Sequence, residues 1–156
     1  MNTIELNVEI YRQLGYLSDD RSYLEKALEL LWGLTRIKST AQARGREYTE
    51  LLESLSDFQD YEQGWDGEDA LPLDKVVIKN FKEVLQNSED RYLKGWIIFP
   101  ERNGTILMQN ERYNAGINIG SKDYSYYINK NGKTVGENAK RFTLASVMET
   151  IKKIHD

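Results

Sequence analysis

Carboxylate side chains are the groups of this chain whose spacing suggests chemistry. Between positions 53 and 69 there are seven acidic residues and no basic one: Glu53, Asp57, Asp60, Glu62, Asp66, Glu68 and Asp69. Carboxylate oxygens bind divalent cations, and they also attract the cationic side chains of a basic partner. The candidate binding residues are therefore Asp60, Trp65, Asp66, Glu68 and Asp69, with Trp65 as an apolar anchor. We assign no catalytic residue and no metal ligand.

Other reactive groups are scarce. The chain has no cysteine, which excludes disulfides, thiolate nucleophiles and cysteine metal sites. Its single histidine, His155, is the second-last residue, where we expect it to complement the dipole of a final helix. A calcium loop starting at Asp60 would need glycine where Trp65 stands. No phosphate loop or dinucleotide motif occurs. These patterns favour a protein that is not an enzyme and binds no cofactor.

Two glycines flank Trp65 and Asp66 in the segment Gly64-Trp65-Asp66-Gly67. One interpretation is structural: Trp65 pins a connector between helices, and Asp66 accepts hydrogen bonds from nearby backbone N–H groups. The other is functional: Asp66, Glu68 and Asp69 gather around a cation or a basic partner. We favour the structural interpretation and leave the functional one open.

The pattern Tyr61-x-x-Gly64-Trp65-Asp66-Gly67-x-x-Ala70-x-Pro72 resembles a segment that recurs in a broad group of small uncharacterised bacterial proteins. The resemblance covers about residues 58–130. It implies a bacterial, cytoplasmic protein in which this connector leads into a helix and then a sheet. It implies no activity.

The elements that must position these residues follow from hydrophobic periodicity. Helical spacing predicts helices over 4–17, 24–34 and 48–58, the last two forming a helical hairpin unless residues 18–60 make one long helix. Further helices are predicted after Pro72, ending at Asn87-Ser88, and from an N-cap at Thr143. Between them, alternating residues predict strands at 96–99, 105–108, 115–119 and 124–128, with a short edge at 134–135. Asn103-Gly104 and Asn131-Gly132 are hairpin signals.

The fold class is therefore α+β: N-terminal helices, then a four- to five-stranded antiparallel meander covered by helices, including the C-terminal one. We divide the chain into an N-terminal helical region, 1–60, and an α+β domain, 61–156, packed as one unit. No apolar run approaches the roughly 20 residues that span a bilayer, so we expect a cytoplasmic protein without a membrane partner.

Three functions remain open. The first is a non-enzymatic protein-binding module, such as an acidic inhibitor of the antitoxin or immunity type, whose partner has a basic surface. The second is a divalent-metal-dependent enzyme using Asp66, Glu68 and Asp69. The third is single-stranded nucleic acid binding through the tyrosines at 113, 124, 126 and 127, although a formal net charge of -4 makes nucleic acid an unfavoured partner. A homodimer through the N-terminal helices is also conceivable.

Overall fold

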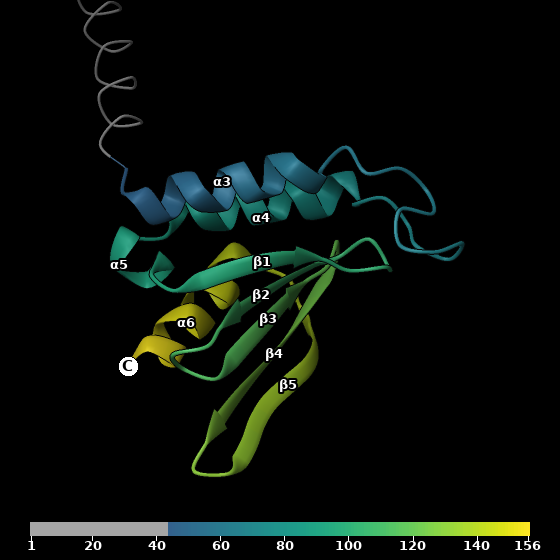
Figure 1. Ribbon diagram of the computed structural model, residues 1–156. Coiled ribbons are helices and arrows are strands. Elements are labelled where there is room, and N and C mark those ends of the chain that lie inside the picture. Colours follow the sequence, from purple (N-terminus) through teal and green to yellow (C-terminus); the bar gives the residue numbers. More distant parts are fainter. Residues whose placement is uncertain (1–43) are drawn as a thin grey trace, which may run out of the picture. The chain divides into compact units, whose positions relative to one another are not determined.

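The computed structural model describes residues 44–156, and Gly45–Asp156 form one compact unit (Figure 1). Its helices are α3 (Arg46–Phe58), α4 (Lys75–Asn87), the short α5 (Asp90–Leu93) and α6 (Leu144–His155). Its strands are β1 (Trp96–Pro100), β2 (Ile106–Asn110), β3 (Ala115–Ile119), β4 (Asp123–Lys130) and β5 (Lys133–Arg141). The α+β class is thus confirmed. The helices expected before residue 44, and a dimer formed through them, lie outside the described residues. Helix α3, which the sequence-based division placed in region 1–60, is part of this unit.

The five strands form one antiparallel sheet in the order β1-β2-β3-β4-β5. This is the meander predicted from the short connections, because neighbouring strands joined by tight turns pair in sequence order. At the β4–β5 turn, Asn131 and Gly132 have φ angles of 52° and 75°. Positive φ at both central residues is the requirement of a two-residue hairpin turn, so the Asn-Gly signal identified this turn correctly.

Strand β5 is much longer than the two-residue edge predicted at Thr134-Val135. It runs for nine residues and pairs with β4 along its length, with a register shift between Tyr124 and Tyr126. Ala139, next to this shift, has a φ of 52°. The prediction was too short because β5 is almost entirely exposed. An edge strand without a buried face shows no alternation of apolar and polar residues.

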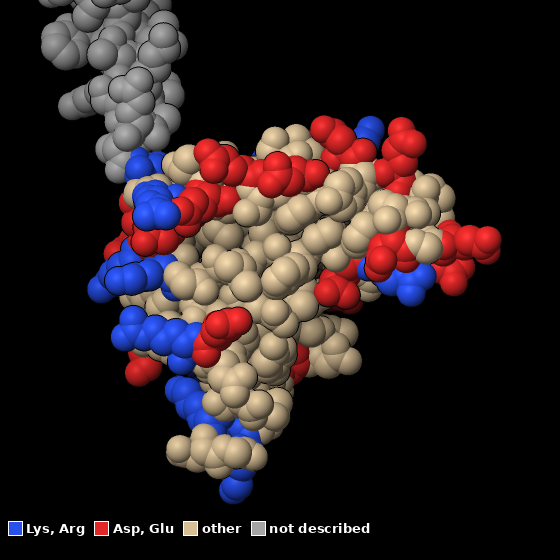
Figure 2. Space-filling view, viewed as in Figure 1, with Lys and Arg blue, Asp and Glu red and all other residues tan. Residues whose placement is uncertain are grey.

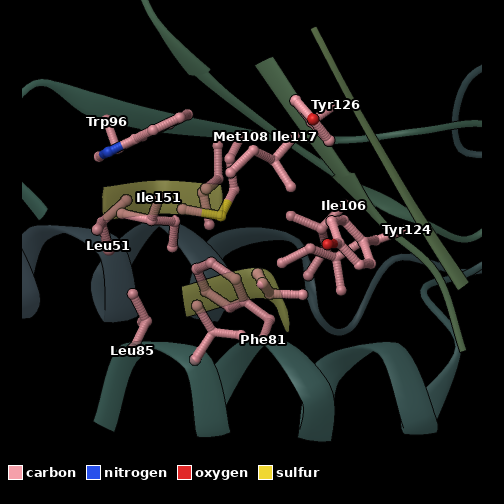
Figure 3. Close-up of a cluster of buried hydrophobic side chains, with 14 of the residues drawn as sticks. Leu51, Phe81, Leu85, Trp96, Ile106, Met108, Ile117, Tyr124, Tyr126 and Ile151 are labelled. Carbon is pink, nitrogen blue, oxygen red and sulfur yellow. The ribbon is translucent and has the colours of Figure 1, made fainter. Parts of the chain in front are cut away.

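The core lies between the sheet and the helices α3, α4 and α6, which cover one of its faces (Figures 1 and 3). Apolar residues at helical spacing supply one side and alternate residues of the strands supply the other. The buried side chains of this core include Leu51, Leu55, Val77, Phe81, Val84, Ile106, Met108, Ile117, Ile119, Val147, Ile151 and Ile154. Burying each contributes roughly 1.5–3 kcal/mol, so this single core holds both layers together.

Side-chain caps fix where two of these helices begin. The Asp74 carboxylate accepts hydrogen bonds from the Val76 and Val77 N–H groups over 2.7 and 3.3 Å, so α4 begins at Lys75. Pro72 suits the first turn of a helix, but it lies before the N-cap of α4 and outside the helix. The Thr143 hydroxyl accepts from the Ser146 N–H over 3.1 Å, which confirms Thr143 as the N-cap of α6.

Two of the sheet tyrosines belong to the core. Tyr124 and Tyr126 are 1% and 6% exposed, and their rings lie on the helix-covered side of β4 (Figure 3). The Tyr124 hydroxyl hydrogen-bonds Ser146 and Thr150 of α6 over 2.6 and 3.1 Å. Neither ring can stack on a base, so the arrangement gives no support to nucleic acid binding through a row of tyrosines.

Candidate functional site

The loop of residues 59–74 connects α3 to α4 and is docked on the β1–β2 hairpin. The Leu71 N–H donates to the Arg102 carbonyl over 2.7 Å, and the Asp74 N–H donates to the Gly104 carbonyl over 3.1 Å. Trp65 is half-buried. Its indole N–H donates to the Leu71 carbonyl over 2.8 Å, and its ring lies 5.1 Å from that of Tyr61. This is the geometry that the structural interpretation of Trp65 requires.

The Asp66 carboxylate does not accept the backbone hydrogen bonds that the structural interpretation assigned to it. Its carboxylate is exposed and lies 3.9 Å from the Arg102 guanidinium, on the β1–β2 hairpin. The turn is closed instead by backbone bonds, from the Gly64 N–H to the Ala70 carbonyl and from the Ala70 N–H to the Gly67 carbonyl. Gly64 and Gly67 have φ angles of 83° and 96°, which is why glycine is needed at both positions.

The remaining predicted site residues, Asp60, Glu68 and Asp69, are all exposed. The structure brings them into the same loop as Trp65 and Asp66 but not around a common point. Across residues 44–156, no three Asp, Glu or His side chains are placed so that they could hold a metal ion. In the same range, no helix has the length and apolar character needed to cross a membrane.

An acidic groove lies between α3 and β1. Glu50, Glu53 and Asp57 recur at intervals of three and four residues, so they lie on one side of α3. Because Leu51 and Leu55 hold the inner side of the helix in the core, the three carboxylates are exposed. With Leu51, Ser54, Trp96 and Ile97 they line a groove of about 330 Å³.

The acidic groove is part of a longer acidic band. Figure 2 shows acidic side chains along α3 and over the loop beyond it, whereas basic side chains gather at the opposite end of α3 and at the tip of the β4–β5 hairpin. Below α3, over β1, the surface is largely uncharged. Ile97 lies on this strand and is 45% exposed. The groove thus combines a negatively charged wall with an apolar neighbour.

A second concave surface lies on the face of the sheet away from the helices. Tyr127 of β4 pairs with Gly116 on one side and Gly136 on the other. The Tyr127 ring lies over Gly116, where a Cβ would overlap it, and the sheet is hollowed beside this ring. The hollow has a volume of about 460 Å³, and its other lining residues include Leu107, Asn118, Ser125, Thr134 and Asn138.

His155 is not a fully exposed surface residue. It does lie in the last turn of α6, but its ring is half-buried among three aromatic side chains. The ring centroids of Tyr113, Tyr92 and Trp96 lie 4.6, 5.6 and 6.2 Å from its own. Burial lowers the pKa of His155 below its usual value.

Sequence reasoning found the acidic loop but missed the groove and the hollow. A signal for the groove was present, since Glu50, Glu53 and Asp57 share the helical spacing of the predicted 48–58 helix. The groove also needs Trp96 and Ile97, about 40 residues later in the chain, and nothing in the sequence indicates that pairing.

Comparisons of the chain with protein-family models, with curated proteins and with solved structures find no match.

Proposed function

We propose that this chain is a non-enzymatic protein-binding module whose acidic groove takes up a basic segment of a partner protein. One observation carries the proposal: three carboxylates of α3 form the wall of a 330 Å³ groove that also has apolar lining from β1. A groove of this composition suits side chains that are cationic at one end and apolar along their length.

Lysine and arginine have this character. Their charged heads would contact Glu53 and Asp57, since Glu50 already pairs with Arg46, while their methylene stems would lie against Ile97 and Trp96. A pair of unit charges about 4 Å apart near a protein surface attracts by up to roughly 4 kcal/mol before desolvation and lost side-chain entropy are subtracted. Several such pairs in one groove can fix the orientation of a partner.

The acidic band extends the attraction beyond the groove. Exposed carboxylates at Asp60, Glu68 and Asp69 continue it along the loop after α3. Charge of one sign over a broad surface raises the rate at which an oppositely charged partner associates. A protein with a basic active surface, such as a nucleic-acid-directed toxin, has the chemistry of such a partner, and this chain would then act as its acidic inhibitor.

The test compares two pairs of charge-removing substitutions. The probe is a synthetic peptide in which arginine alternates with leucine, titrated calorimetrically into the full chain at about 50 mM salt, where screening is weak. We expect Glu53→Gln with Asp57→Asn, in the groove, to weaken binding about tenfold or more, which corresponds to about 1.4 kcal/mol. Glu68→Gln with Asp69→Asn removes the same charge from the loop and serves as the matched control.

The control should lose less than about threefold in affinity. Raising the salt to about 300 mM should weaken the wild-type complex, because the attraction is screened. Equal losses in the two double variants would mean that the peptide responds to net charge and not to the groove. That result, or no binding of the peptide to the wild-type chain, would overturn the proposal.

A further inference from the structure

The pair Asn-Gly occurs twice in the chain, as Asn103-Gly104 in the β1–β2 turn and as Asn131-Gly132 in the β4–β5 turn. The side-chain amide of an asparagine and the backbone nitrogen of the next residue can close a five-membered ring. Glycine in the second place favours this closure, because it has no Cβ to crowd its own nitrogen. The two pairs therefore share the same intrinsic chemistry, and only the surrounding structure distinguishes them.

The first pair is held in place by hydrogen bonds. The Asn103 side-chain oxygen accepts from the Thr105 N–H over 3.2 Å and from the Thr105 hydroxyl over 2.7 Å. The Gly104 N–H donates to the Glu101 carbonyl over 3.0 Å. The docked loop adds a further restraint, since a Cβ on Gly104 would meet the Pro72 carbonyl oxygen at 3.0 Å. Ring closure at this turn would break these hydrogen bonds, and each bond given up raises the barrier.

The second pair has no such restraint. Asn131 and Gly132 are both exposed, and within residues 44–156 the structure places no hydrogen-bond partner at the Asn131 side chain or at the Gly132 N–H. A Cβ on Gly132 would meet no atom within 4 Å, so the space around the turn is open. Below the turn the strands stay tied, because the Thr134 hydroxyl donates to the Asn129 side-chain oxygen over 2.8 Å. The two reacting groups can thus meet without giving up a hydrogen bond of their own.

We propose that Asn131 is a site of spontaneous chemical modification, at which attack by the Gly132 nitrogen converts the side-chain amide to a carboxylate. Hydroxide takes the proton of the Gly132 N–H, and the nitrogen forms a bond to Cγ of Asn131. The bond from Cγ to Nδ2 then breaks, and Nδ2 takes a proton from water and leaves as ammonia. A second water molecule opens the cyclic imide at either of its carbonyls. Holding both groups on adjacent residues makes the attack intramolecular, which is what lets it proceed without a catalyst.

The two directions of ring opening give different products. Opening at Cγ gives aspartate, which keeps the main chain unchanged and suits the positive φ of this turn. Opening at the main-chain carbonyl gives isoaspartate, in which the chain runs through the former side chain and is longer by one carbon atom. We expect this product to loosen the pairing of Lys130 with Lys133, which directly precedes the turn. Both products make the formal net charge of -4 more negative by one.

The experiment incubates the full chain at mildly alkaline pH, once in native buffer and once unfolded in guanidinium chloride. Cleavage after glutamate releases the peptides 102–111 and 112–137, and tandem mass spectrometry measures the modified fraction at each asparagine against a sample taken at time zero. In the native chain Asn131 should react at least about tenfold faster than Asn103, which corresponds to a barrier lower by about 1.4 kcal/mol. In the unfolded chain the two rates should agree within about threefold, because only the shared Asn-Gly sequence remains.

Gly132→Ala tests the identity of the attacking group. Its methyl group crowds the nitrogen and should slow the modification of Asn131 by about tenfold or more, both in native buffer and in guanidinium chloride. The rate at Asn103 should not change, so this residue is the internal control. Because the unfolded sample gives the same comparison, the test does not depend on how well the variant folds.

Three results would overturn the inference. The first is an equal rate at Asn131 and Asn103 in the native chain. The second is a difference that persists in guanidinium chloride, since it would then come from the local sequence and not from the fold. The third is a Gly132→Ala protein that is modified at Asn131 as fast as the wild type. The acidic groove lies on α3 and β1, away from this turn in the sequence and in its residues, so the peptide titration can succeed or fail independently.

Discussion

The indole N–H of Trp96 donates a hydrogen bond to Nε2 of His155 over 3.0 Å, joining the first residue of β1 to the last turn of α6. An imidazole nitrogen that accepts a hydrogen bond carries no proton, so His155 is neutral with its proton on Nδ1. The one histidine of the chain is therefore a half-buried hydrogen-bond acceptor that joins two elements 59 residues apart in the sequence.

This hydrogen bond predicts that stability depends on pH. Burial lowers the pKa of His155; the nearby Arg112 lowers it too, while Asp156 and a hydrogen bond to the Tyr92 backbone raise it. The folded state thus binds a proton less readily than the unfolded chain, whose histidine titrates near about 6.5. The contribution of His155 is fully present above that pH and is lost as the pH falls toward the lowered value.

The prediction is measured as the difference between two urea unfolding curves at each pH. In His155→Gln the amide oxygen can accept from Trp96 but does not titrate. The carboxylates that both proteins share contribute equally to the pH dependence of the two unfolding free energies, so their contribution cancels in the difference. The wild-type chain should lose stability relative to the variant as the pH falls below about 6.5. A constant difference across this range would show that His155 protonation is not coupled to folding.

Asp74 is expected to stabilise α4 through its two backbone hydrogen bonds. Asp74→Ala should lower the free energy of unfolding by about 1 kcal/mol, the usual cost of losing an N-cap. Asp69→Ala removes an exposed carboxylate from the same loop without removing a cap and should cost less than about 0.5 kcal/mol. Urea denaturation at pH 7 measures both, and equal losses would mean that charge and not capping is responsible.

Gly136 is expected to be indispensable to the β4–β5 pairing. A Cβ at this position would overlap the Tyr126 carbonyl oxygen on the neighbouring strand, and backbone atoms cannot move aside cheaply. Gly136→Ala should therefore cost more than about 2 kcal/mol, as overpacking does when the strands must separate. Gly132→Ala is the comparison: it meets no atom within 4 Å and suffers only from its positive φ, about 1 kcal/mol. Thermal unfolding should rank the two variants in this order.

Trp65 is expected to act on stability and not on peptide binding. Trp65→Phe keeps an aromatic ring beside Tyr61 but removes the N–H that bonds the Leu71 carbonyl, at a cost of about 1 kcal/mol. The affinity for the arginine–leucine peptide should stay within about twofold of the wild type, because Trp65 does not line the groove. A tenfold loss of affinity in this variant would instead assign the loop a direct part in binding.

The elements that the sequence predicted well are those with one buried face. Ala115, Ile117 and Ile119 alternate with Gly116 and Asn118, and the strand they predict is β3 with the same bounds. The α6 residues repeat at helical spacing and follow a clear N-cap. In both cases the core imposes a period on the sequence, and the period is what reveals the element.

The elements that the sequence predicted only in part or not at all lack such a period. Strand β5 has no buried face, and α5 is only four residues long, too short to repeat. The acidic groove and the cluster around His155 are built from residues that meet only when β1 lies against α3 and α6. Their components were visible in the sequence, but the pairing of distant segments was not.

The irregular pairing of β5 affects how the chain behaves when it is crowded. A long outer strand offers its free N–H and C=O groups to any other extended chain, which is how stacked fibrils grow. Here the bulge near Tyr126 bends the ladder, and Lys133, Lys140 and Arg141 place positive charge along the strand. Both features disfavour edge-to-edge stacking at β5. A flat, uncharged strand of this length in the same place would nucleate amyloid-like aggregates more readily.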